Sequence, residues 1–77
     1  MKKSEIKTIA DRIATKAKAV NVVVKNGASR CNKLQYELNG MLNVLKTLDI
    51  EYEFGWDYTV QYMTCFKIPA YDIDVIL

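Results

Sequence analysis

The first third of the chain places its apolar residues at helical spacing. They recur three or four positions apart and form one stripe: Ile6, Ile9, Ala10, Ile13, Ala14, Ala17 and Val20. Ser4 suits the N-cap of such a helix, and Glu5 suits the positive end of its dipole. The pattern therefore predicts a helix over residues 4–20. The β-branched run 21–25 fits either an extension of this helix or a short extended segment, and Asn26-Gly27 predicts a turn after it.

The second apolar pattern is an a/d heptad seam with 3-4-3-4-3 spacing. It consists of Cys31, Leu34, Leu38, Met41, Leu45 and Leu48, and Leu42 widens it. Fewer than three heptads are too short for a free coiled coil, so we expect an antiparallel hairpin with the first helix. Gly40 lies away from the seam and costs about 1 kcal/mol of helix propensity relative to Ala. Close approach of another element would explain it.

After residue 49 the apolar period changes from 3.6 to 2, as in strands. The first run is Ile50, Tyr52, Phe54 and Trp56, and the second is Tyr58, Val60, Tyr62, Thr64, Phe66 and Ile68, with a turn predicted at residues 55–58. Beyond Pro69, alternating Tyr71, Ile73, Val75 and Leu77 predict a third strand or a strand-like tail. The expected fold is α+β, a single domain over residues 1–77 in which a two-helix hairpin packs on a small antiparallel sheet. Its order is ααββ, or ααβββ if the last run pairs.

Length and cysteine content indicate the cellular setting. A chain of 77 residues forms one domain with a thin core. Cys31 and Cys65 stand in unrelated contexts, so we expect two reduced thiols and a cytoplasmic protein, although a single disulfide between them stays open. Lys2 and Lys3 are followed by no signal-peptide core, and no apolar run approaches the roughly 20 residues that cross a bilayer. We therefore expect no association with membranes.

The residue types argue against catalysis. The sequence contains no histidine, which removes the commonest general base and the commonest transition-metal ligand. It also lacks a Gly-rich phosphate loop and a nucleophile elbow. We expect a protein that is not an enzyme and that needs no cofactor or metal.

Charge is distributed unevenly along the chain. Residues 1–48 carry a net charge of +7 and residues 49–77 a net charge of −5. The acidic half contains two i, i+2 pairs and one residue near a predicted turn: Glu51, Glu53, Asp72, Asp74 and Asp57. If the strands pair, these carboxylates form an acidic outer face. Such a face is most often simply solvated. Alternatively it imitates DNA and occupies a basic surface of another protein, or the two halves of the chain neutralise each other.

The basic half suggests nucleic-acid binding as a competing hypothesis. The phosphate contacts would come from Arg12, Lys16, Arg30 and Lys33. On a helical wheel, however, the lysines and arginines of residues 4–20 flank the apolar stripe on both sides and do not gather on one face. No aromatic residue is interleaved with them as a base-stacking platform requires.

A polar stripe on the second predicted helix offers another binding surface. Asn32, Tyr36, Asn39 and Asn43 are spaced i, i+4, i+7 and i+11, opposite the leucine seam. Asn is a poor helix former, so such a face is unusual. Uncharged Asn and Tyr offer hydrogen bonds at little desolvation cost. The stripe either faces water or caps a neighbouring loop, or it contacts a partner that Gly40 allows to come close.

Two segments carry a resemblance to known sequences. Residues 11–18 (DRIATKAK) and residues 40–57 resemble small proteins encoded by phages and mobile elements of Gram-positive bacteria. The resemblance implies an accessory protein that inhibits or modulates a host enzyme or defence complex. Our first hypothesis is therefore a protein-binding modulator of a host protein. The alternatives are a nucleic-acid-binding regulator and a homodimer in which the basic face of one copy meets the acidic face of another.

Overall fold

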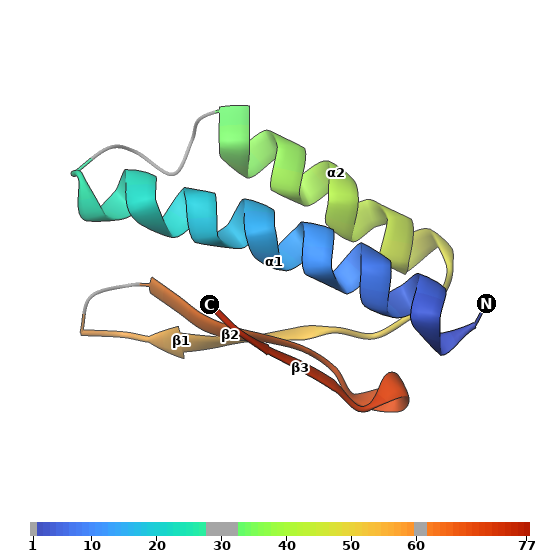
Figure 1. Ribbon diagram of the computed structural model, residues 1–77. Coiled ribbons are helices and arrows are strands. Elements are labelled where there is room, and N and C mark those ends of the chain that lie inside the picture. Colours follow the sequence, from blue (N-terminus) through green and yellow to red (C-terminus); the bar gives the residue numbers. More distant parts are fainter. Residues whose placement is uncertain (1, 28–32, 60–61) are drawn as a thin grey trace.

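The computed structural model describes residues 2–27, 33–59 and 62–77. Two helices, α1 (Lys3–Lys25) and α2 (Lys33–Thr47), precede a sheet (Figure 1). The strands β1 (Glu53–Asp57), β2 (Tyr62–Ile68) and β3 (Ile73–Ile76) pair antiparallel with β2 in the centre, and a 3₁₀ turn, η1 (Pro69–Tyr71), joins the last two. The predicted α+β class is confirmed, including the third strand.

Helix α1 is the middle layer of the molecule. It packs against α2 on one side and against β2 and β3 on the other, and α2 runs antiparallel to it (Figure 1). The predicted apolar stripe is buried, apart from the half-buried Ile9. Residues 21–25 continue the helix, which ends where Gly27 takes a positive φ of 79° and donates to the Val24 carbonyl. The prediction of Ser4 as N-cap is wrong, because the N-cap is Lys2 and Ser4 lies in the first turn.

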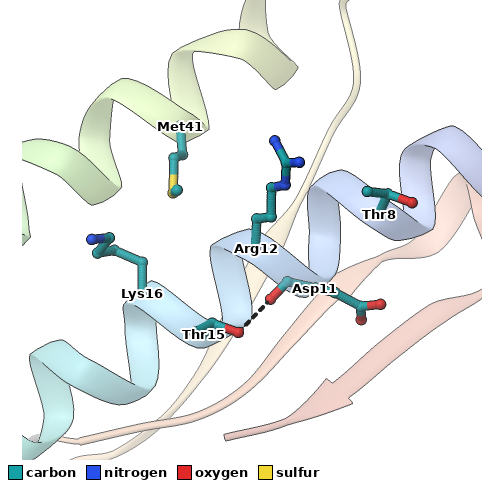
Figure 2. Close-up of a pocket in the computed structure, with 6 residues that line it drawn as sticks. All are labelled: Thr8, Asp11, Arg12, Thr15, Lys16 and Met41. Atoms are coloured by element: carbon teal, nitrogen blue, oxygen red, sulfur yellow. Dashed lines mark hydrogen bonds between the residues drawn. The ribbon is translucent and has the colours of Figure 1, made fainter.

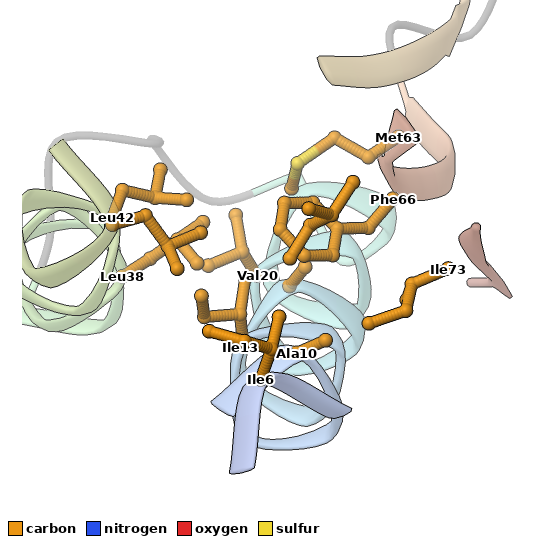
Figure 3. Packing of buried hydrophobic residues seen from close by; sticks show 12 residues of the cluster. Ile6, Ala10, Ile13, Val20, Leu38, Leu42, Met63, Phe66 and Ile73 are labelled. Atoms are coloured by element: carbon orange, nitrogen blue, oxygen red, sulfur yellow. The ribbon is translucent and has the colours of Figure 1, made fainter. Parts of the chain in front are cut away.

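The core forms where the two helices and the sheet meet (Figure 3). Phe66 of β2 is fully buried, and its ring lies 4.9 Å from that of Phe54 and 6.0 Å from that of Tyr52, centroid to centroid. Helix α2 contributes Leu38, Leu42 and Leu45. The predicted heptad seam is therefore rotated: Leu34 and Met41 are only half-buried, Leu48 is exposed, and Cys31 lies outside the described residues.

A buried carboxamide joins α1 to the sheet. Asn21, only 7% exposed, donates from Nδ2 to the Met63 carbonyl (2.8 Å) and accepts at Oδ1 from the Met63 N–H (3.1 Å). Strand β3 pairs with β2 only from Cys65 onward, so Met63 lies beyond its end. The amide therefore satisfies both backbone groups of Met63 where the neighbouring strand is missing.

The β1–β2 pairing contains a bulge that shifts the alternation of side chains. Gly55 pairs with Cys65 and Trp56 with Met63, so Thr64 is an extra residue on β2. Met63 and Phe66 consequently both face the core, whereas Thr64, predicted to face inward, is exposed. The predicted turn at residues 55–58 is also misplaced: β1 continues to Asp57, and the exposed Tyr58 follows it. Val60 lies outside the described residues.

The first prediction concerns Asn21. Asn21→Ala leaves the N–H and C=O of Met63 buried without partners, so we expect the free energy of unfolding to fall by about 2–4 kcal/mol. Urea denaturation measures this change. Asn43→Ala, which removes an exposed carboxamide from α2, is the control and should raise stability by at most about 0.7 kcal/mol, because Ala is the better helix former. Equal stability of the two variants would contradict the role assigned to Asn21.

The second prediction concerns the close packing at Gly55. A Cβ on Gly55 would lie 2.6 Å from Cys65 Sγ and 2.8 Å from Thr64 Oγ1. We expect Gly55→Ala to destabilise the protein by about 1–3 kcal/mol in thermal unfolding. Adding Cys65→Ala should recover part of this loss, because it removes the nearer of the two atoms. A Gly55→Ala variant as stable as the parent would show that the bulge tolerates a side chain.

Candidate functional site

The five acidic candidates are distributed around the sheet. In the register of the strands, Lys67 of β2 lies between Glu53 of β1 and Asp74 of β3. A positive charge therefore stands at the centre of the outer face that was expected to be acidic. Asp57 accepts hydrogen bonds from the backbone N–H (3.0 Å) and the hydroxyl of Thr59, as turn-forming Asp residues do.

The remaining acidic candidates lie outside or at the edge of the strands. Glu51 precedes β1, and Asp72 occupies the left-handed region (φ 54°) between η1 and β3. Asp72 and Asp74 border a hollow whose other side is Lys3 and Lys7 at the start of α1. The basic beginning of the chain thus faces part of its acidic end. This arrangement favours internal charge neutralisation over a continuous acidic surface.

Two of the basic candidates converge on one carboxylate. Lys16 Nζ lies 2.5 Å from Glu37 Oε2, and Lys33 Nζ lies 3.9 Å from Glu37 Oε1. The hydrogen bond from Lys16 lowers the pKa of Glu37 below its ordinary value of 4.5, against the opposing effect of partial desolvation, and the charges of both lysines also lower it. These two ammonium groups are therefore partly neutralised. Arg30 lies outside the described residues.

Arg12 has different surroundings from the other basic candidates. Its guanidinium has no ion-pair partner within residues 2–27, 33–59 and 62–77, whereas its neighbour Asp11 pairs with Lys7 at 2.9 Å. Figure 2 shows Arg12 and Lys16 of α1 projecting on the side where Met41 of α2 lies, while the Asp11 carboxylate points away. Arg12 is thus an uncompensated cation beside α2.

The polar stripe of α2 is exposed, as the sequence predicts. Tyr36 is 70% exposed, and Asn39 and Asn43 are also on the surface. Asn39 accepts a hydrogen bond from Gln35 on its own helix (3.1 Å). Asn32 lies outside the described residues. We call Tyr36, Asn39, Gly40 and Asn43 the α2 outer face.

No described element of this chain packs against Gly40. A Cβ added to it would meet nothing within 4 Å. The expectation that another element of the fold approaches Gly40 is therefore wrong for the described residues. The position opens onto solvent in the middle of a 15-residue helix.

A groove between the helices was missed by sequence reasoning. It is bordered by Ile9, Arg12 and Ile13 of α1 and by Met41 and Val44 of α2. Ile9 and Met41 belong to the predicted buried stripes, whereas Val44 belongs to neither. The available signal was a second apolar row, Met41-Val44-Leu48, beside the row Leu38-Leu42-Leu45.

Other classes of site receive no support from the described part of the chain. It contains no group of three or more Cys, Asp or Glu residues that could hold a metal ion. None of its helices is both long enough and apolar enough to cross a membrane. Comparisons with protein-family models, curated proteins and solved structures found no match to the chain.

The third prediction follows from Glu37. Because its folded-state pKa is lowered, its contribution to stability is present above about pH 4.5 and is lost as the pH falls through the folded-state pKa. We expect urea denaturation of the parent protein to show a steeper loss of stability between about pH 5 and pH 3 than the Glu37→Gln variant shows. Asn43→Ala, which removes no titratable group, is the control and should keep the parental slope. The same loss of stability with falling pH in Glu37→Gln and the parent would show that the lowered pKa of Glu37 does not contribute to stability.

Proposed function

We propose that this protein is a non-enzymatic modulator that binds another protein through the α2 outer face. The observation that carries the proposal is the open space around Gly40. A glycine in a helix interior costs about 0.5–1 kcal/mol relative to alanine, and no described residue of the fold makes use of the missing side chain. Close approach of a partner backbone would account for it.

The residues around Gly40 have the chemistry of a contact surface. Tyr36 presents a large, rigid ring that is 70% exposed, and such rings are enriched among residues that dominate binding energy. Asn39 and Asn43 add hydrogen-bonding groups that are cheaper to desolvate than charges. None of these side chains is ionised, and the nearest carboxylate, Glu37 three positions before Gly40, is already paired with Lys16.

The target is proposed from the sequence resemblance. Small accessory proteins of phages and mobile elements often act on a host enzyme or defence complex, and we propose such a cytoplasmic target here. The acidic residues receive less support as a DNA-like surface, because Lys67 lies between Glu53 and Asp74. Binding of nucleic acid through the basic helices receives less support because Lys16 and Lys33 share Glu37.

The experiment begins with identification of the partner. Tagged protein is used to capture its partner from a Gram-positive bacterial lysate, with and without nuclease, and the captured protein is identified by mass spectrometry and purified. Binding of the purified partner is then measured by calorimetry, and sedimentation establishes whether the free protein is a monomer. Capture of nucleic acid alone, lost at moderate salt, would contradict the proposal.

The fourth prediction separates binding from stability at Gly40. Gly40→Ala should raise the free energy of unfolding by about 0.5–1 kcal/mol, yet weaken binding of the purified partner by about tenfold or more. Lys18→Ala, an exposed change on α1, is the control and should leave affinity within about twofold. A stabilised Gly40→Ala variant that binds as tightly as the parent would refute the α2 outer face as the contact.

A further inference from the structure

The groove between the helices forms one surface with the α2 outer face. Ile13 is its buried floor, Ile9 and Met41 are half-buried walls, and Val44 is 47% exposed at its rim. Val44 follows Gly40 by four positions, so the two residues are neighbours on α2. A partner seated on Gly40 therefore reaches the groove directly.

The shape of this groove suits a helix. Two packed helices leave a furrow along their contact, into which the side-chain ridge of a third helix fits at an interaxial distance of about 8–10 Å. The apolar border from Ile9 to Ile13 and from Met41 to Val44 extends over about one turn on each helix, which accommodates two anchoring side chains spaced i and i+3 or i+4.

The charged residues around the groove indicate which kind of partner helix it would bind. On α1, the cation Lys16 lies beside Arg12 and is compensated by Glu37, whereas Arg12 has no ion-pair partner among the described residues. Covering a guanidinium without supplying a carboxylate is costly. A second copy of this chain fits poorly, since α1 carries six basic against two acidic residues and α2 carries two against one.

We propose that the groove binds an amphipathic helix of the partner protein that presents apolar anchors to Ile9, Met41 and Val44 and a carboxylate to Arg12. This inference rests on the proposed function and adds the chemistry of the partner. The carboxylate would pair with the guanidinium through its two oxygens, an arrangement that favours arginine over lysine.

The fifth prediction uses two synthetic helical peptides of about 18 residues, or five turns. Both carry leucines at i and at i+3 or i+4, and they differ only in having glutamate or lysine beside the leucines. In ¹⁵N-labelled protein, the acidic peptide should cause saturable shifts of the Ile9, Arg12, Met41 and Val44 amides, with affinity at least about tenfold above that of the basic peptide. Arg12→Glu should reverse this preference.

Lys18→Glu is the matched control, because it makes the same charge change at an exposed position of α1 about 120° around the helix from Arg12, on the other side of the apolar stripe. It should keep the preference for the acidic peptide. Absence of saturable binding, equal affinity for both peptides, shifts confined to other surfaces, or equal effects of the two charge reversals would each overturn the inference. With the purified partner, loss of binding in Gly40→Ala but not in Arg12→Glu would overturn the groove as a binding site and leave the proposed function standing. Unchanged binding in both variants would overturn the groove and the proposed function together.

Discussion

The arrangement of this fold depends on the paired hydrogen bonds between Asn21 and Met63. The apolar stripe of α1 is rich in alanine, with Ala10, Ala14 and Ala17 all buried, and a stripe of small, similar residues places a helix along its axis only weakly. A shift of α1 by one turn, about 5.4 Å, would keep apolar residues against the sheet. It would also separate the Asn21 amide from Met63 and leave buried polar groups unsatisfied. The Asn21 amide thus fixes one position of α1 along the sheet, among several that would bury the apolar stripe.

The same interaction explains why the strands could be predicted only in part. Period-2 alternation correctly indicated strands, and the pattern after Pro69 correctly indicated the third one. The alternation continues unbroken through Thr64, however, whereas the pairing does not. The bulge coincides with contacts between distant parts of the chain: the backbone N–H and C=O of Met63 bond to Asn21, and the Thr64 carbonyl accepts from the N–H of Leu77 (3.0 Å). The residue type at position 64 does not predict these long-range contacts.

The candidate surfaces were predictable to different degrees for a similar reason. The exposure of Tyr36, Asn39 and Asn43 follows from their place opposite the leucines, so helical periodicity sufficed. The charge of the outer sheet face could not be predicted from periodicity, because placing Lys67 between two carboxylates requires the strand register. The groove was missed since α2 carries two adjacent apolar rows, and only the position of α1 decides which row is covered.

Helix α2 is the outer layer of a small domain, so its anchoring limits what its surface can do. It is held to α1 by three fully or largely buried leucines and by the ion pair between Lys16 and Glu37. In its second apolar row Met41 packs against the core, whereas Val44 and Leu48 are exposed and Gly40 has no side chain. A partner helix in the groove would touch α1 through Ile9 and α2 through Met41 and Val44, and would therefore hold the two helices together. Binding at this surface and the stability of the hairpin are then linked, and a ligand that favours the packed hairpin raises its stability by mass action.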